Sequence, residues 1–538
     1  MKKNRFLILF LVLLGITSCT KDEHTSNTDV PGLTEEVYFE LVGDIQSIGL
    51  KEHYQALIQE ASQGNDEGDE QLLEFALSQL DATEKYEEEC INLVGANWES
   101  GPDGEDGRNR LLGYRYATLR YKSIDHTGST VMLSTLVVWP YNNILADPDA
   151  SNIIIGCHVT IGSNAERPSN YSKNDITTDV GMLACCAKSN GSGLSYENLV
   201  VIPDYQGYGA THGEVHPYLS QELTARQVLD GVRAGKAFYE KKLGHKLKDG
   251  WKSLSTGYSQ GGSVAMAVHK YIEENNLTSE FNFVGSVCGS GPYDPIATLQ
   301  KYVNEDKLYM PVAAAMMIHS MCETNPRLMG KYKVKDYITE AFINTKIFDN
   351  IKSKAYDTDQ INDALLEHSA EYNLDDETSL CMYRKVGKEF YPYRKDTKEK
   401  YVWDSGNTTS YAIMSDCFRP EVINWMKGEK DPAHKDKMEA LMGALNDNVL
   451  YNDWTPAHPI ILFHTYYDEV VPIENYRSCL NSWENSPNVK GVRYMGLTMY
   501  HVAYGKAFYV RHCGWGIESI LGEDLSEFQF DGILLGLY

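Results

Sequence analysis

Gly257-Tyr258-Ser259-Gln260-Gly261 is the stretch of sequence on which the fold assignment depends. Its pattern, Gly-x-Ser-x-Gly, is typical of a serine held in a sharp turn between a strand and a helix, where side chains two positions away on either side would clash. Residues 254–256 can end such a strand, and residues 264–268 can begin such a helix. The backbone N–H of Gln260 would then face an oxyanion that develops beside Ser259.

Short apolar runs recur on both sides of this stretch, at residues 153–155, 199–202, 283–288 and 460–463. Runs without polar alternation suit strands that are buried on both faces of a parallel sheet. Further upstream, residues 114–124 and 131–139 are β-rich, and Asp125-His126-Thr127-Gly128 between them has the composition of a hairpin turn. Because helical stretches separate the apolar runs, we predict an α/β protein with a mostly parallel central sheet and helices on both faces.

The alternation of strands and helices stops after Pro295 and resumes at Ile460, with charge-rich helical sequence between them. This gap predicts a large, mainly helical insertion that caps the sheet domain. Before the sheet, a helical pattern is broken by the polar segment 64–68, which predicts N-terminal helices. The predicted segments are a signal peptide (1–18), a tether (19–34), an N-terminal helical extension (35–100), the first part of the core (105–295), the cap or lid (296–455) and the second part of the core (456–538).

The first twenty residues differ in composition from the rest of the chain. Lys2, Lys3 and Arg5 precede an apolar run over residues 6–16, which is too short for a membrane-spanning helix but typical of a signal peptide. Ile16-Thr17-Ser18-Cys19 resembles the lipobox of bacterial lipoproteins, in which Cys19 would carry the lipid. Thr20-Lys21-Asp22-Glu23 resembles the tag that directs some Gram-negative lipoproteins to the cell surface. We expect an exported lipoprotein of the Gram-negative outer membrane; the alternative is an ordinary cleaved signal followed by an incidental cysteine.

The excess of acidic over basic residues limits the kinds of partner that the chain can bind. With 75 acidic and 49 basic residues, the formal net charge is −26, which disfavours nucleic acids and anionic membrane surfaces. Membrane attachment would therefore depend on the acyl chains at Cys19.

The eleven cysteines include no Cys-x-x-Cys pair, so zinc-ribbon and thioredoxin-type sites are not expected. Cys157, Cys185 and Cys288 lie in apolar runs and are predicted to be small buried side chains.

A nucleophilic serine needs a histidine as its base and an acid that fixes the histidine tautomer. Asp468 follows the apolar run 460–463, and His501 follows a further strand-like run near residues 492–495. Both are placed in loops after strands, where catalytic side chains are usually presented, and we select them as acid and base. Glu469 and Asp294 are further candidates for the acid. Two more histidines are less suitable as the base, because His464 falls within a strand and His512 lies too far from a strand end.

The remaining site residues follow from loops after predicted strands. The loop over residues 156–162 is the place for a second oxyanion donor, and the backbone N–H of Val159 or Thr160 fits by position. His212 and His216 have the spacing of a metal pair, but Gly209, Gly213 and Pro217 indicate a loop, so we predict no metal and no cofactor. His216 is instead assigned to a substrate pocket, together with the nearby side chains His158, Tyr205 and Tyr258.

Residues 195–270 resemble the secretory lipase family of α/β hydrolases. The resemblance is carried by Val201-Ile202-Pro203-Asp204-Tyr205-Gln206-Gly207-Tyr208-Gly209, by His216-Pro217-Tyr218-Leu219 and by Val228-Leu229-Asp230-Gly231-Val232-Arg233-Ala234, which continue into the serine motif. It implies an α/β-hydrolase fold and hydrolysis of carboxylic esters through an acyl-enzyme, with Ser259, Asp468 and His501 at the matching motif positions. The oxyanion loop departs from the usual histidine-glycine signature.

These observations lead us to expect a cofactor-independent esterase or lipase that acts on a small-molecule, lipid or glycan ester. A serine peptidase or aminopeptidase could use the same three residues, and acidic residues in the predicted cap, such as Glu367 and Asp375, could then recognise a peptide terminus. A third hypothesis is a non-catalytic surface binding protein that has kept the fold. The presence of all three candidate catalytic residues argues against it.

Overall fold

The computed structural model describes residues 37–64, 67–94, 112–187, 197–362, 383–386, 389–392, 411–495 and 500–534. Those from Tyr38 onwards belong to one compact unit. The predicted signal peptide, the tether with Cys19, and the cap residues Glu367 and Asp375 lie outside the described residues. Within the described part of the chain, no helix is both long enough and apolar enough to cross a membrane.

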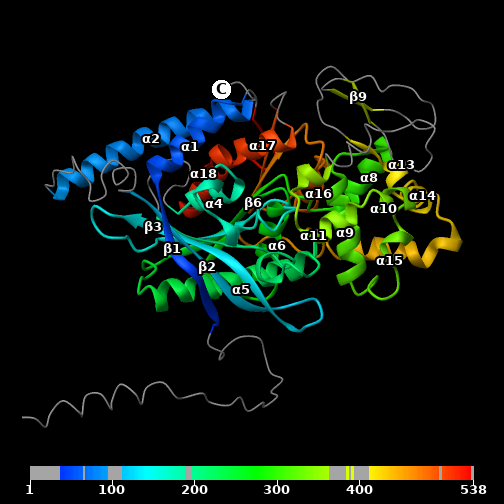
Figure 1. Cartoon of the computed structure of the whole chain (residues 1–538), viewed down its shortest axis with the longest axis horizontal. Coiled ribbons are helices and arrows are strands. Elements are labelled where there is room, and N and C mark those ends of the chain that lie inside the picture. Colours follow the sequence, from blue (N-terminus) through cyan, green and yellow to red (C-terminus); the bar gives the residue numbers. More distant parts are fainter. Residues whose placement is uncertain are drawn as a thin grey trace, which may run out of the picture. The chain divides into compact units, whose positions relative to one another are not determined.

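A central sheet organises the molecule, as Figure 1 shows, and its hydrogen-bond pairing gives it ten strands. Its first three strand pairs are antiparallel and all later pairs are parallel, so the predicted mostly parallel sheet is confirmed. The predicted hairpin is present, with Ile124 opposite Thr130 across the turn. In spatial order the strands are β1 (Phe39–Gly49), β2 (Leu112–Ile124), β3 (Thr130–Asn142), β5 (Asn198–Pro203), β4 (Asn152–Cys157), β6 (Lys252–Tyr258), β7 (Phe283–Gly289), β12 (Ile460–Thr465), β13 (Val489–Tyr494) and β14 (Gly532–Leu534).

Strand β1 corrects the prediction that residues 35–100 are helical throughout. Phe39–Gly49 pairs with β2 along the sheet edge, whereas α1 (Leu50–Ala61) and α2 (Glu67–Val94) are helices as expected. Phe39 and Leu41, two residues apart, both pack against the same core cluster. Alternate residues share a face in a strand but not in a helix, so the extended conformation buries both side chains while β2 satisfies the backbone.

Helices cover both faces of the sheet, as predicted (Figure 1). On one face the core includes side chains from α5 (Gln221–Ala237), α6 (Gln260–Glu274) and α16 (Glu474–Ser482). On the other face it includes side chains from α1, α2, α4 (Asp179–Cys185), α17 (His501–Ala507) and α18 (Gly514–Leu521). Ile153 and Ile155 of β4 point to the first core and Ile154 to the second, which explains why this run shows no polar alternation.

Between β7 and β12 the chain is mainly helical, and its apolar side chains form a third hydrophobic cluster that also includes Tyr218 and Leu219 from the loop before α5. The hydroxyl of Tyr302 donates a hydrogen bond to the carbonyl of Val470, which joins this segment to the loop after β12. Its helices are α8 (Pro295–Glu305), α9 (Pro311–Thr324), α10 (Glu340–Asn344), α11 (Ile347–Ser353), α13 (Met414–Cys417), α14 (Pro420–Met426) and α15 (Lys435–Asn446), and its two-stranded pairs are β8 (Lys307–Leu308) with β11 (Ala412–Ile413) and β9 (Tyr383–Val386) with β10 (Glu389–Pro392).

The nine cysteines within the described residues are all free thiols, and eight of them are buried. Cys157, Cys185 and Cys288 are among the buried ones, so the prediction that they act as small core side chains is confirmed.

Candidate active site

Ser259 occupies a sharp turn between β6 and α6. Its backbone has φ 55° and ψ −124°. Residues other than glycine rarely adopt such a positive φ, because it costs conformational energy. The two motif glycines allow the turn to pack against the end of β4. A Cβ on Gly257 would lie 2.3 Å from the carbonyl oxygen of Cys157, and one on Gly261 would lie 2.1 Å from it. The motif therefore requires glycine at both positions.

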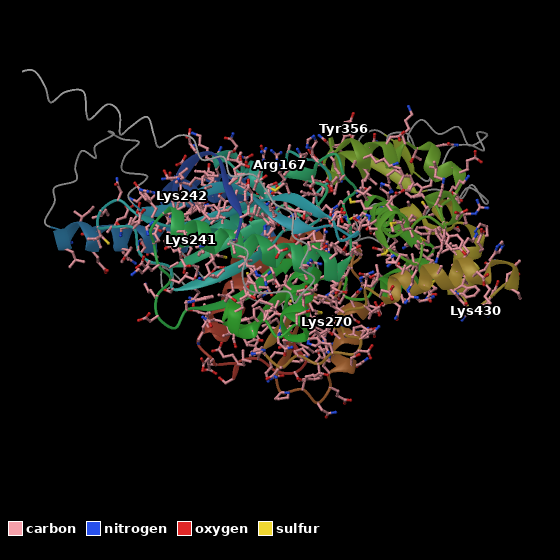
Figure 2. All side chains as sticks on the ribbon, turned by 90° about the horizontal axis from the view of Figure 1, so that it is seen from below. Arg167, Lys241, Lys242, Lys270, Tyr356 and Lys430 are labelled. Carbon is pink, nitrogen blue, oxygen red and sulfur yellow. The ribbon has the colours of Figure 1, made fainter. Side chains whose placement is uncertain are left out.

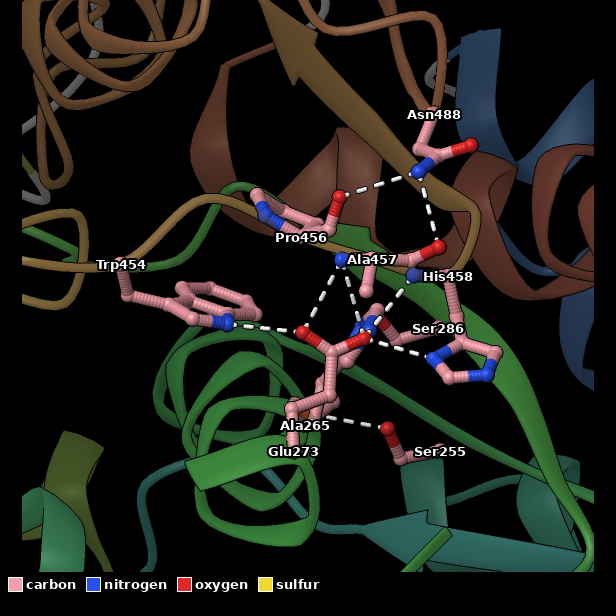
Figure 3. Close-up of polar contacts among 10 residues, drawn as sticks. Ser255, Ala265, Glu273, Ser286, Trp454, Pro456, Ala457, His458 and Asn488 are labelled. Atoms are coloured by element: carbon pink, nitrogen blue, oxygen red, sulfur yellow. Dashed lines mark hydrogen bonds and ion pairs between the residues drawn. The ribbon is translucent and has the colours of Figure 1, made fainter. Parts of the chain in front are cut away.

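The polar character of β6 also has a structural reason. The hydroxyl of Ser255 donates to the carbonyl of Ala265 in α6 at 2.8 Å, a bond that Figure 3 shows. On the other face of the strand, the Thr256 hydroxyl lies 3.2 Å from the Cys513 thiol. These partners compensate for the burial of two hydroxyl groups, and the small side chains allow helices to pack closely on both sides of the strand.

Ser259, His501 and Asp468 form one hydrogen-bonded series. Nε2 of His501 lies 2.8 Å from Oγ of Ser259, and Nδ1 lies 2.7 Å from Oδ2 of Asp468. The second carboxylate oxygen of Asp468 accepts from the backbone N–H groups of Val470 and Val471 at 3.1 and 2.7 Å, which fixes its orientation. The three side chains follow β6, β12 and β13, whose carboxyl ends lie at the same sheet edge because these strands are parallel.

Charges around His501 favour its protonated form. Burial alone lowers the pKa of this imidazole, but the charge and hydrogen bond of Asp468, together with the charge of Glu469, raise it above its ordinary value of 6.5. Oε2 of Glu469 also accepts from the backbone N–H of His501 at 3.0 Å. Glu469, the neighbouring candidate for the acid, thus contacts the backbone of His501, while Asp468 contacts its ring.

Asp294, His464 and His512, the remaining candidates for acid and base, each have their main hydrogen-bonding or stacking partners outside the series just described, although His464 Nε2 also lies 3.7 Å from Asp468 Oδ2. Asp294 caps α8 by accepting from the N–H groups of Ile296 and Ala297, both at 2.9 Å. His464 lies within β12, as expected, with Nε2 2.8 Å from the carbonyl oxygen of Val471. His512 is a buried core residue whose ring stacks on Phe463.

The predicted oxyanion donors have different surroundings. Gln260 is the first residue of α6, so its N–H has no acceptor within the helix and lies directly beside Ser259. The N–H of Val159 donates to the carboxylate of Asp179 at 2.9 Å, which corrects its assignment as an oxyanion donor. The hydroxyl of Thr160 lies 3.1 Å from that of Tyr218, and its N–H has no acceptor among the described residues. Asp179 was missed because in sequence it resembles an ordinary helix-starting acid.

The four predicted pocket residues are buried next to the nucleophile turn. His158 stacks on Tyr205 with ring centroids 4.0 Å apart, and Tyr205 stacks on His216 at 6.1 Å. The ring of His216 lies next to Gln260, whose side-chain amide is 3.0 Å from Nε2. The hydroxyl of Tyr258 donates to the carbonyl of His501 at 2.7 Å. It therefore supports the backbone of His501, and pocket lining remains a prediction for all four residues.

Within the described residues, one group of side chains has the composition and proximity of a metal site, namely His269, Glu273 and His458. Oε1 of Glu273 lies 3.0 Å from Nε2 of His269 and 2.7 Å from Nδ1 of His458. The same carboxylate accepts from the indole of Trp454 at 2.8 Å and from the backbone N–H groups of Ala457 and His458 (Figure 3). Because hydrogen-bond donors already surround this carboxylate, we interpret the group as a structural hydrogen-bond network that connects α6 to the segment before β12. His212 and His216 are not part of it.

Comparisons with known proteins bear on the fold. No protein-family profile matches the chain, and no curated protein sequence matches it either. The rice cell wall degrading esterase LipA from Xanthomonas oryzae has a similar structure, with 19% identity, a TM-score of 0.54 and coverage of 77% of this chain and 92% of that one. A Legionella pneumophila protein named as a hydrolase has 17% identity, a TM-score of 0.55 and coverage of 76% and 89%. Together with the sheet described above, these similarities show that the chain has an α/β-hydrolase fold.

Proposed function

We propose that this protein is a serine hydrolase that cleaves carboxylic esters through an acyl-enzyme intermediate. The observation that carries the proposal is the hydrogen-bonded series of Ser259, His501 and Asp468, with distances of 2.8 and 2.7 Å. Nucleophile, base and orienting acid are then in the arrangement that nucleophilic acyl transfer requires. The resemblance to secretory lipases and the structural similarity to LipA, which is named as an esterase, support an ester as the substrate.

In this mechanism, Nε2 of His501 takes the proton of the Ser259 hydroxyl while Oγ attacks the ester carbonyl. The backbone N–H of Gln260 stabilises the resulting oxyanion, a contribution of ~10²–10³ in rate for one such donor. His501 then returns the proton to the leaving alcohol, and water enters by the same base-assisted route to release the acid. Asp468 keeps Nδ1 protonated and so leaves Nε2 free to accept. Thr160 remains our candidate for a second donor.

The first test is Ser259→Ala, assayed with 4-nitrophenyl esters of increasing acyl length. We expect a loss of at least about 10³-fold in kcat/KM, because the nucleophile is removed. A fluorophosphonate probe should label the wild-type protein but not the variant. Full ester hydrolysis by folded Ser259→Ala would contradict the proposal, and preference for aminoacyl anilides over esters would move it to a peptidase.

The second test distinguishes the two candidate acids. Asp468→Asn should lower kcat by about 10⁴-fold, because the amide no longer holds the required histidine tautomer. Asp294→Asn is its matched control, since an asparagine can still cap α8. If the Asp294 variant loses activity and the Asp468 variant keeps it, the acid has been wrongly assigned.

We further propose that the protein is exported and anchored to the outer membrane, facing the cell surface, through a lipid on Cys19. The basic head, the apolar run and the lipobox-like residues 16–19 support this. Cells fed radiolabelled palmitate should incorporate label into the wild-type protein but not into Cys19→Ser. Equal labelling of the two proteins would contradict the anchor without affecting the proposed chemistry.

A further inference from the structure

Lys354 is a buried cation that has no acidic partner among the residues that the structure describes. It ends α11, its backbone is left-handed with φ 53°, and the residue is only 6% exposed. Among the described residues its ammonium makes neither an ion pair nor a hydrogen bond; its contact is the face of Tyr208, whose ring centroid is 4.2 Å from Nζ. Burial lowers the pKa of Lys354 to about 8, so the side chain is still mainly charged at neutral pH. A buried charge without a counter-ion is costly, which suggests that a ligand supplies the missing anion.

The segment that carries Lys354 packs on the loop after β4, where we place the oxyanion site. The carbonyl of Lys354 accepts from the N–H of Asn164 at 2.8 Å. Two residues further on, the carbonyl oxygen of Tyr356 approaches Gly162 so closely that a Cβ there would be 2.6 Å from it. Figure 2 labels Tyr356 on the helical segment and Arg167 on the sheet domain, and the side chain of Arg167 in turn donates to the carbonyl of Asn164.

A short series of contacts connects Lys354 to the nucleophile turn. The ring of Tyr208, under the ammonium, lies 5.1 Å from the ring of His216. Nδ1 of His216 donates to the carbonyl of Gln206 at 2.8 Å, so Nε2 can accept from the Gln260 amide at 3.0 Å. After burial, the charge of Lys354 is the next largest cause that lowers the pKa of His216. The ammonium is therefore close enough to the predicted pocket for its charge to act there.

We propose that Lys354 forms an anion subsite that selects esters whose acyl or alcohol part carries a carboxylate. This inference rests on the proposed function, since it names the class of ester that the site prefers. A substrate carboxylate would give the ammonium a counter-ion, which the described residues do not provide, in surroundings where a charge pair is only weakly screened. The net charge of −26 makes this local cation more notable, because the rest of the molecule repels anionic substrates.

The test compares substrate pairs that differ mainly in charge. For the acyl part these are 4-nitrophenyl hemisuccinate and 4-nitrophenyl butyrate; for the alcohol part, O-acetylglycolate and 2-methoxyethyl acetate. We expect the wild-type enzyme to prefer the anionic member of at least one pair in kcat/KM, and the responding pair identifies the part that binds. Lys354→Met should lower that anionic-to-neutral ratio by about 10- to 100-fold, the loss expected for one hydrogen-bonded charge pair.

Lys352→Met is the matched control, because Lys352 is an exposed lysine two residues away, and its ratio should equal that of the wild type. Lack of anionic preference in the wild type for both pairs would overturn the subsite without any variant. An unchanged ratio in Lys354→Met with a native melting temperature would also overturn it. Failure of the proposed function gives a different result, because the neutral esters would then not be hydrolysed in a Ser259-dependent way.

Discussion

Gly261 lies two residues after the nucleophile and has no room for a side chain. A Cβ there would meet the carbonyl oxygen of Cys157 at 2.1 Å, which is a contact with backbone. Gly261→Ala should therefore displace the end of β4 or the nucleophile turn, lower stability by about 1–3 kcal/mol and reduce ester hydrolysis by about 10². Gly213 is the matched control for stability, because its Cβ would meet nothing within 4 Å. A native melting temperature and activity in Gly261→Ala would contradict this explanation of the motif.

Protonation of His501 should set the acidic limb of the pH profile. The imidazole acts as a base only when neutral, and Asp468 and Glu469 raise its pKa above 6.5 despite burial, so kcat/KM should rise with pH through that raised value. Glu469→Gln removes one negative charge and should move the limb to lower pH. Glu222→Gln, an exposed change on α5, should leave the limb in place. A limb that does not move in Glu469→Gln would show that Glu469 has no electrostatic effect on the base.

The positions of single residues could be predicted from the sequence where they depend only on which strand each residue follows along the chain. Ser259, Asp468 and His501 each follow a strand, and parallel strands bring their following loops to one edge. The engagement of Val159 by Asp179 and the burial of Lys354 depend instead on how separate segments pack, which no local pattern encodes. Residues that act through packed neighbours therefore had to come from the structure.

Among the elements, α6 has important residues in both its first and its last turn. Its first turn carries Gln260, and its last turn carries Glu273, which accepts from His269, His458 and Trp454. Burial alone would raise the pKa of Glu273, but the hydrogen bonds from the two histidines lower it well below its usual value. Its contribution to stability is therefore fully present above about pH 4.3 and is lost as the pH falls toward the folded-state value.

Glu273→Gln should destabilise the fold by about 3 kcal/mol, because a buried charge that several donors share is removed. The next residue provides the control. Glu274 is 46% exposed in its side chain and lies 3.8 Å from Lys270, so Glu274→Gln should cost less than about 1 kcal/mol. Thermal melts of both variants at neutral pH measure the difference. Equal melting temperatures of the two variants would show that the hydrogen bonds of Glu273 contribute little to stability.

At the scale of elements, buried parallel strands were easy to predict and edge strands were not. Ile153–Ile155 and their equivalents form uninterrupted apolar runs, whereas Phe39–Gly49 is a half-exposed edge strand whose pattern also fits a helix. Only its pairing with β2 resolves the ambiguity. Strand β6 is buried like the apolar strands but has a polar sequence, so its burial was hard to predict. Its hydroxyl groups find their partners on other elements: Ala265 lies in the helix after the next turn, and Cys513 lies far away in the sequence.

For the whole molecule, the thiols give a test of the packing. Nine described cysteines are free and only Cys186 is partly exposed among them. The native protein should therefore react slowly with Ellman's reagent, apart from Cys186 and cysteines outside the described residues. In urea without reductant, at least nine thiols should react. A count of eight or fewer would mean that one of these cysteines forms a disulfide in the exported protein.

The distance along the chain between Ser259 and His501 has a consequence for synthesis. The two residues are 242 positions apart, and the whole helical segment between β7 and β12 is made between them. A nascent or truncated chain that ends before residue 501 carries a nucleophile but no base. Hydrolytic activity can appear only after residue 501 has been made, so a shorter chain that is still being synthesised inside the cell is an inactive precursor of the enzyme we propose.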